Sequence, residues 1–201
     1  MYSLQDQYAR GRMTLADIFE WLNEMGAGLE FISDQMMKGT PEPSPETLVE
    51  WDALVDRYKP ALVCNDVFIN TCLYKNRTLT KKESLDLLIK EIKLAHRLGF
   101  PMIRLVSNTR ADIIGPALPY AEKYHVVMTL EIHAGMSFDE PLTQDFIRVM
   151  KDLDSPYVGL TLDTSIFCER HPRVATNFFR ELGVNEELIR RIDAIFESGK
   201  I

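Results

Sequence analysis

Apolar and polar positions alternate most clearly in the stretch VVMTLEIH, residues 126–133. Because side chains alternate along a strand, Thr129, Glu131 and His133 share one face of it. The opposite face is apolar, and the stretch is rich in the β-branched and aliphatic residues that favour strands. The pattern therefore predicts a carboxylate and an imidazole that point the same way at the carboxyl end of a buried strand.

Strand patterns recur roughly every 25 to 40 residues, with one segment of helical periodicity between each pair. This rhythm is typical of βαβ units and predicts parallel strands. A weaker strand pattern covers Met1 to Leu4, as the tail of a strand. The clear strand patterns lie at residues 29–33, 61–65, 102–106, 126–133 and 157–163.

Capping residues mark where several helices begin. Thr14 with Asp17 and Thr80 with Glu83 have the spacing of a capping box, in which two side chains satisfy the first free backbone groups of a helix. Ser44 precedes a proline, the arrangement expected of an N-cap followed by a first-turn proline. We therefore predict helices that begin directly after Thr14, Ser44 and Thr80.

Polar side chains stand at the carboxyl ends of most predicted strands, which is the edge where barrels and open α/β sheets hold their chemistry. The chain has no GxGxxG or GxxxxGK[ST] motif, which would favour a doubly wound nucleotide-binding fold. The sequence therefore predicts an α/β fold of the (β/α)8 barrel type. The polar strand ends are Glu30, Asn65 with Asp66, Arg104 with Asn108, Glu131 with His133, and Asp163.

The sequence contains fewer strand patterns than a closed barrel requires. Five clear strands and one doubtful strand are found, whereas a closed barrel needs eight. Because an unclosed barrel exposes strand edges, we expect either the N-terminal part of a longer barrel or a barrel that a partner completes. The expected assembly is a homo-oligomer or a complex with a small partner subunit.

Composition indicates one globular domain over residues 1–201, with 46% hydrophobic and 26% charged residues. The net charge of −7 and the pI of about 5.2 disfavour a broad surface for nucleic acid. No stretch resembles a membrane span or a signal peptide, and three scattered cysteines suit a reducing compartment. We therefore expect a cytoplasmic protein without a nucleic-acid or membrane partner.

Four segments follow, in order, a pattern that resembles the xylose isomerase-like TIM barrels: GAGLEFIS, IKLAHRLGFPMIRLVSN, LPYAEKYHVVMTLEIH and SPYVGLTLD. Within that superfamily, MYSLQDQY, ISDQMMKGTPEP and LDTSIF resemble sugar phosphate isomerase/epimerase-like proteins akin to the large subunit of C-glycoside deglycosidases. The resemblance covers nearly the whole chain. It implies an incomplete xylose isomerase-like barrel with about six βα units.

The resemblance also implies a metal site, because in that superfamily a Glu, an Asp, a His and a second Glu from separate strand ends hold a divalent metal. By position, Glu131 matches the first Glu and Asp163 matches the Asp. The His and the second Glu would come from later strands, since His171 follows Asp163 too closely. Ile166 stands where many isomerases and epimerases carry a His, which favours the deglycosidase-like branch. Carboxylate and imidazole ligands suit Mn²⁺, with Mg²⁺, Co²⁺ or Zn²⁺ as alternatives.

The chemistry expected from this site is removal of a proton beside a carbonyl group of a sugar or sugar derivative. His133 is the predicted base and Glu131 a metal ligand and second base, whereas Glu30, Asn65 and Arg104 are predicted substrate contacts. Return of the proton to another carbon or face gives an isomerase or epimerase. Expulsion of the aglycone carbon from a 3-oxo sugar gives a C-glycoside lyase. A third hypothesis is a catalytically incomplete barrel that acts as an assembly partner.

Structural roles compete with these assignments. Glu131 can pair with Arg104 or cap a helix, and Arg104 can be a structural counter-ion. Asp163 can be the N-cap of the segment that follows it. His133 can be a hydrogen-bonded histidine at the mouth of the barrel.

Overall fold

A computed structural model describes residues 2–69, 76–106, 109–168 and 170–199; Asn108 lies outside these ranges. The chain forms two compact units. The first unit comprises Met1–Ile132 and Phe138–Thr161, and the second comprises His133–Ser137 and Leu162–Ile201. The expectation of a single domain over residues 1–201 stays a prediction.

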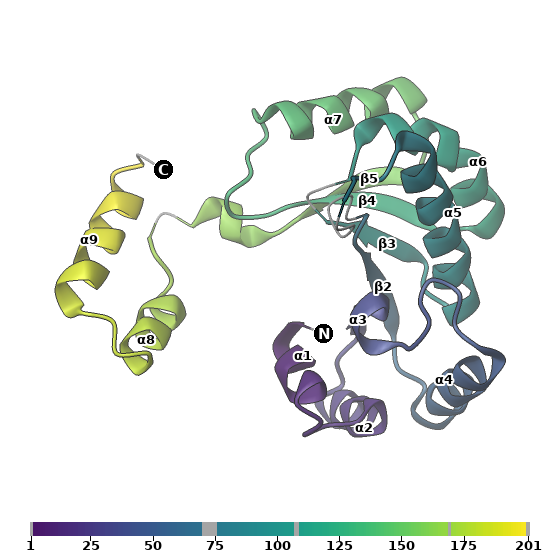
Figure 1. The fold of residues 1–201 in the computed structure, drawn as a ribbon, viewed down its shortest axis with the longest axis horizontal. Helices are drawn as coiled ribbons and strands as arrows, with labels where there is room; N and C mark the ends of the chain where they lie inside the picture. Colours follow the sequence, from purple (N-terminus) through teal and green to yellow (C-terminus); the bar gives the residue numbers. More distant parts are fainter. Residues whose placement is uncertain (1, 70–75, 107–108, 169, 200–201) are drawn as a thin grey trace. The chain divides into compact units, whose positions relative to one another are not determined.

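The first unit is built on a sheet in which the strands follow one another in chain order, β1-β2-β3-β4-β5 (Figure 1). Each of β1, β2 and β3 pairs in parallel with the next strand, as the βαβ rhythm predicts. The order never reverses, unlike that of a doubly wound sheet, so the observed topology is that of a barrel wall. The strands are β1 (Leu29–Phe31), β2 (Leu62–Val67), β3 (Met102–Leu105), β4 (Val127–Ile132) and β5 (Val158–Leu162).

Successive helices pack against one another, α4 on α5, α5 on α6 and α6 on α7, and Figure 1 shows α5 and α6 along one side of the strands. The capping predictions are confirmed: Thr14 and Thr80 form capping boxes, and the Ser44 side chain accepts from the Thr47 amide. The helices of this unit are α1 (Tyr2–Ala9), α2 (Leu15–Met25), α3 (Ser33–Met36), α4 (Pro45–Tyr58), α5 (Lys81–Leu98), the 3₁₀ turn η1 (Ala111–Ile113), α6 (Ile114–Tyr124) and α7 (Pro141–Leu153).

The strand predicted at Met1 to Leu4 is wrong, because Tyr2–Ala9 forms helix α1. A strand needs a neighbouring strand to satisfy its backbone groups, whereas a helix satisfies them within the segment. The Tyr8 hydroxyl donates to the Met36 carbonyl oxygen (3.0 Å), which joins α1 to α3. The described part of the chain thus holds five strands rather than six.

The hydrophobic core lies between the sheet and its helices. Phe31 of β1, Trp51 of α4 and Phe100 form an aromatic group with ring centroids 4.9 to 6.1 Å apart. The Trp51 indole N–H also donates to the Leu98 carbonyl oxygen (3.1 Å), so this polar group is satisfied within the core. Leu105 of β3 belongs to the same core. Because side chains alternate along a strand, its neighbour Arg104 points to the opposite face of the sheet.

The second unit contains the 3₁₀ turn η2 (Thr164–Phe167) and the helices α8 (Arg173–Glu181) and α9 (Glu186–Glu197), which contact each other. His171 Nδ1 lies 3.0 Å from the Asp193 carboxylate on α9, and its ring stacks on Phe179 of α8. His171 therefore links these two helices. Among the described residues, no helix combines the length and apolar character that a membrane span needs.

Candidate functional site

Four charged side chains meet on the face of the sheet that points away from the core. Glu30, Asp66, Arg104 and Glu131 come from β1, β2, β3 and β4, one from each strand. The strand register places Asp66 directly opposite Arg104. Arg104 in turn lies opposite Thr129, two residues before Glu131. A long arginine side chain can therefore reach the carboxylates of both neighbouring strands.

Arg104 binds these carboxylates through different edges of its guanidinium group. Its Nε and Nη2 atoms each donate to the Asp66 carboxylate over 2.7 Å. Its Nη1 atom donates to Glu131 Oε1 over 2.5 Å, and Nη2 lies 2.9 Å from Glu30 Oε1. The contact with Asp66 is the bidentate geometry in which arginine binds carboxylates best. We call this group of four side chains the Arg104 network.

Burial determines the electrostatics of the Arg104 network. The exposed fractions of the side chains are 0% for Asp66, 8% for Glu131, 10% for Arg104 and 39% for Glu30. Exclusion of water raises the pKa of Asp66 to about 7, against the lowering effect of its hydrogen bonds to Arg104. When all four groups are ionised, three carboxylates surround one guanidinium, and the network carries an excess of negative charge.

The structure brings together three of the predicted site residues, Glu30, Arg104 and Glu131. Asn65, a predicted substrate contact, lies outside the network, and its Oδ1 atom accepts from the backbone amide of Ser33 (3.3 Å). Asp66, which alternation places on the opposite face from Asn65, binds Arg104 through both carboxylate oxygens and was not predicted as a site residue. Both residues stand at the same strand end. They differ in the face of the sheet to which they point, and only Asp66 points away from the core.

His133 and Asp163 belong to the second unit. Strand β4 ends at Ile132, so His133 is the first residue after it, and its Nδ1 atom lies 2.8 Å from the Ala134 carbonyl oxygen. Asp163 Oδ1 accepts from the Ser165 amide (2.8 Å), so Asp163 is the N-cap of η2. The joint role of Glu131 and Asp163 as metal ligands stays a prediction.

The chemistry of the Arg104 network suits a cation, because carboxylate oxygens are the ligands of hard divalent ions and the network has an excess of negative charge. Within the residues that the structure describes, no three or more His, Cys, Asp or Glu side chains are grouped so that they could hold a metal ion. A metal bound by Glu131 would therefore need further ligands from outside the Arg104 network.

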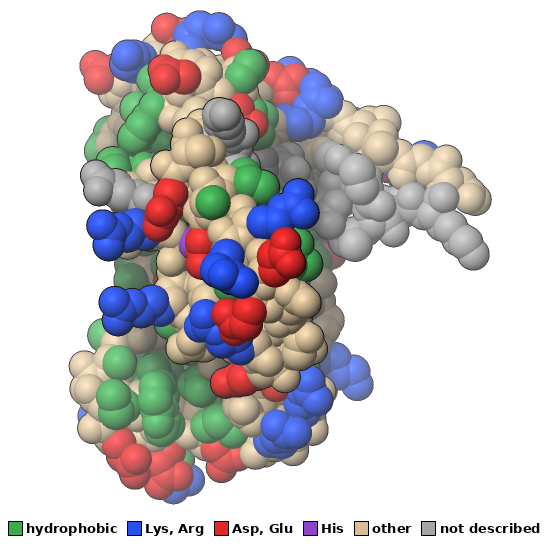
Figure 2. Space-filling view, turned by 90° about the vertical axis from the view of Figure 1, so that its left-hand side faces the viewer, with side chains coloured by type: hydrophobic (Ala, Val, Ile, Leu, Met, Phe, Trp, Pro, Cys, Tyr) green, Lys and Arg blue, Asp and Glu red, His purple; other side chains and the backbone are tan. Residues whose placement is uncertain are grey.

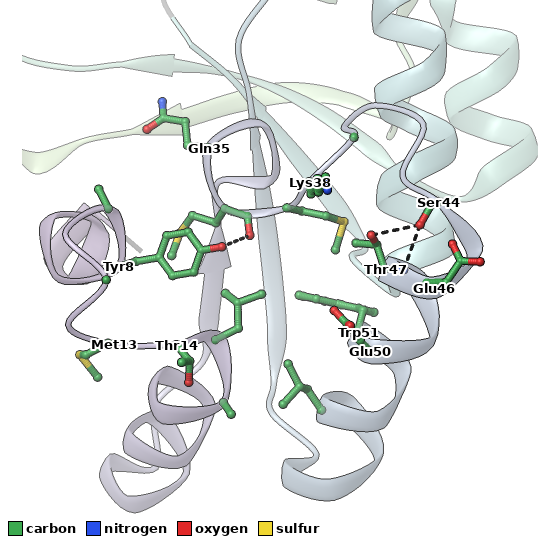
Figure 3. A pocket seen from close by; sticks show the side chains of 18 of the residues that line it. Tyr8, Met13, Thr14, Gln35, Lys38, Ser44, Glu46, Thr47, Glu50 and Trp51 are labelled. Carbon is green, nitrogen blue, oxygen red and sulfur yellow. Dashed lines mark hydrogen bonds between the residues drawn. The ribbon is translucent and has the colours of Figure 1, made fainter.

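A concavity lies elsewhere in the first unit. It is a groove of about 1260 Å³ that includes residues of α1, α2, α3 and α4, and none of the predicted site residues lines it. Figure 3 shows the Tyr8 hydroxyl bonded to the backbone on one side and the Ser44 cap with Thr47 on the other. The groove runs between helices. Its volume is therefore no evidence for a site at the strand ends. On the face shown in Figure 2, acidic and basic side chains intermingle.

Parallel strands in chain order, helices packed in series, and charged groups toward the strand ends define a barrel-type α/β protein. The chain belongs to the xylose isomerase-like TIM barrel family, whose family model matches residues 19–185. This result confirms the predicted fold class.

Two curated relatives align with most of this chain. The C-glycoside deglycosidase alpha subunit of Arthrobacter globiformis is 29% identical over 175 residues, which cover 83% of this chain and 46% of the relative. The 3'-dehydrocarminate deglycosidase alpha subunit of a Microbacterium species is 26% identical over 195 residues, which cover 96% of this chain and 56% of the relative. The chain thus spans about half the length of these relatives.

Solved structures share the fold at lower sequence identity. The 3-keto-D-glucoside 4-epimerase of E. coli superposes with a TM-score of 0.54 and 14% identity, covering 84% of this chain and 70% of the epimerase. The IOLI protein, in a structure with a zinc atom, has a TM-score of 0.54 and 16% identity, covering 76% of this chain and 58% of that protein. At these identities the likeness concerns the fold alone.

Proposed function

We propose that the protein is an enzyme that removes a proton beside a carbonyl group of a sugar or sugar derivative, with a divalent metal as cofactor. The observation that supports this proposal is Glu131, an acid buried toward the carboxyl end of β4 and bound to Arg104. Barrel enzymes hold their catalytic groups at this end of their strands. The charge excess of the Arg104 network also suits a bound cation.

Glu131 and Asp163 would hold the metal, for which Mn²⁺ is the expected ion and Mg²⁺, Co²⁺ or Zn²⁺ are alternatives. When bound, such an ion would polarise the carbonyl group of the substrate and stabilise the negative charge that develops as the proton leaves. Side chains of the protein would remove the proton and bind the substrate.

His133 is the proposed base. A carbonyl oxygen can only accept a hydrogen bond, so the 2.8 Å contact with Ala134 places a hydrogen on Nδ1 of the imidazole. Nε2 of the neutral ring is then free of hydrogen and can take a proton from the substrate. Glu30 is the proposed substrate contact, because its side chain is the most exposed of the Arg104 network and its oxygens can accept from sugar hydroxyls.

Cleavage of a C-glycoside is a second candidate for the outcome of this step. It is favoured by the curated relatives, which are named as deglycosidase alpha subunits and align with 83% and 96% of this chain. After removal of the proton beside the 3-oxo group, the electron pair would expel the aglycone carbon, which takes up a proton. As the relatives are subunits by name, we propose that this protein also works with a small partner subunit.

The shared first step can be tested by hydrogen exchange. The complete protein with Mn²⁺ is incubated in D₂O with a 3-oxo glycoside, and NMR follows the signal of the proton beside the carbonyl. We expect exchange with the natural protein and its loss in Glu131→Gln. Glu50→Gln, a matched change on the exposed surface of α4, should keep the exchange rate.

The outcomes separate the two candidate reactions. Release of the aglycone supports a lyase, whereas a rearranged sugar supports an isomerase or epimerase. Failure of the natural protein to exchange any proton, or of Mn²⁺ to bind at micromolar concentration in calorimetry, would contradict the proposal and favour a non-catalytic assembly role.

A further inference from the structure

The guanidinium group of Arg104 binds its acidic partners in fixed directions. A guanidinium group is planar, and its N–H groups point outward in fixed directions. Asp66 binds two of its nitrogen atoms, Nε and Nη2, at 2.7 Å each. Two contacts on one edge of a rigid plane determine where the remaining edge points. Nη1 consequently faces β4, where it donates to Glu131 Oε1.

Because these side chains are buried, water cannot easily replace Arg104 as the partner of Asp66 and Glu131. Asp66 has no exposed side-chain surface, and Glu131 has 8%. If the Glu131 side chain turned away from Arg104, its charge would lose a partner in a region with little access to solvent, which is costly. The carboxylate of Glu131 is therefore held in one orientation, with Oε1 bound to Arg104.

We propose that Arg104 is a positioning residue that orients the Glu131 carboxylate, and that Asp66 in turn orients Arg104. This inference rests on the proposed function, since it concerns the acid that would bind the metal. With Oε1 bound to Arg104, Oε2 is the oxygen that Glu131 offers to a cation. Arg104 then contributes to metal binding through Glu131, without being a metal ligand itself.

The chain contains a matched control for this arrangement. Arg97 on α5 binds Asp52 on α4 through two hydrogen bonds of 2.8 and 2.6 Å. These side chains are 44% and 47% exposed, and neither belongs to the Arg104 network. Substitutions of this surface pair change the same chemical groups without reaching Glu131.

The first experiment measures Mn²⁺ affinity by calorimetry in the complete protein and in Arg104→Lys, Asp66→Asn and Arg97→Lys. Loss of an outer partner of a metal ligand weakens binding by about 10-fold to 100-fold. We expect that loss in Arg104→Lys and a smaller loss in Asp66→Asn, which keeps the volume and one acceptor oxygen. Arg97→Lys should bind as the natural protein does. Unchanged affinity in both network variants would overturn the inference.

A second measurement does not depend on the metal. Side-chain ¹³C NMR of Glu131 reports its carboxyl environment and its rotamer populations. We expect one conformer in the natural protein, averaging over several in Arg104→Lys, and no change in Arg97→Lys. If the natural protein bound no Mn²⁺ but the Glu131 signal still averaged in Arg104→Lys, the proposed metal role would fail and the positioning role would stand. An unaltered Glu131 signal in Arg104→Lys would refute the positioning role alone.

Discussion

Two arginine–aspartate pairs of this protein have similar hydrogen-bond distances, but the pKa values of their aspartates shift in opposite directions. Arg104 binds Asp66 on the sheet through two hydrogen bonds of 2.7 Å, and Arg97 binds Asp52 between α5 and α4 at 2.8 and 2.6 Å. The hydrogen bonds from Arg97 lower the pKa of Asp52. Burial raises the pKa of Asp66 to about 7 although its arginine partner is equally close.

At Asp66 the loss of hydration outweighs an arginine at hydrogen-bond distance, whereas at the exposed Asp52 the arginine has the larger effect on the pKa. An exposed pair keeps its hydration, so its net effect on stability is small. A buried pair has lost its hydration, and its mutual attraction must offset that loss. The Arg104 network is therefore poor evidence for stability by itself, and its burial is consistent with the positioning role that we propose for Arg104.

Removal of each arginine tests this comparison with the largest expected effect. Arg104→Met would leave Asp66 and Glu131 buried without their cation and should lower the free energy of unfolding by about 3 to 5 kcal/mol. Arg97→Met should change it by about 0 to 1 kcal/mol, since Asp52 stays hydrated. Denaturant unfolding at pH 7.5 measures both values. Equal losses in the two variants would show that burial is not the deciding factor.

The pH dependence of stability tests the opposite pKa shifts. The pKa of Asp66 rises in the folded state from 3.8 to about 7, so the native protein binds this proton more tightly than the unfolded chain. Its contribution to stability is present below pH 4 and is lost as the pH rises to about 7. Asp52 has a lowered pKa, so its contribution is present above its ordinary pKa and is lost as the pH falls.

Unfolding measured from pH 2 to pH 8 should therefore show a decline in stability above pH 4 that Asp66→Asn reduces. Asp52→Asn, the matched surface change, should leave this decline in place and instead reduce the loss of stability below pH 4. A decline that is identical in Asp66→Asn and the natural protein would contradict the raised pKa of Asp66.

Glu91 on α5 is buried, and the effect expected from its substitution is smaller. Among the residues that the structure describes, its side-chain Oε2 atom has no hydrogen-bond partner, and burial, followed by the charge of Asp34, raises its pKa to about 8. Glu91→Gln should change the melting temperature little near pH 4, where this glutamate is largely protonated in both the folded and the unfolded protein. As the pH rises from 4.5 to about 8, the natural protein should lose stability relative to the variant, because its unfolded chain ionises at this position before the folded protein does. A thermal melt series from pH 4 to pH 9 measures this, and a constant difference across it would count against burial as the cause.

The sequence alone predicted most of the fold because the relevant forces are local. The capping boxes at Thr14 and Thr80 and the cap at Ser44 satisfy backbone groups within one turn, so the helix starts follow from neighbouring residues. Alternation likewise placed Glu131 opposite the apolar face of β4. The prediction of a strand at Met1 to Leu4 was wrong, because a strand exists only with a partner strand that lies elsewhere in the chain.

Only the tertiary structure decided how the charged strand ends combine. Sequence patterns alone do not distinguish Asn65 from Asp66, since both stand at one strand end, and they leave Arg104 open as a substrate contact or a counter-ion. The parallel register then put Asp66 opposite Arg104 and Arg104 within reach of Glu131. These contacts join residues 27 and 38 positions apart in the chain. Pairing over such separations depends on strand register and burial, which no local pattern of residues specifies.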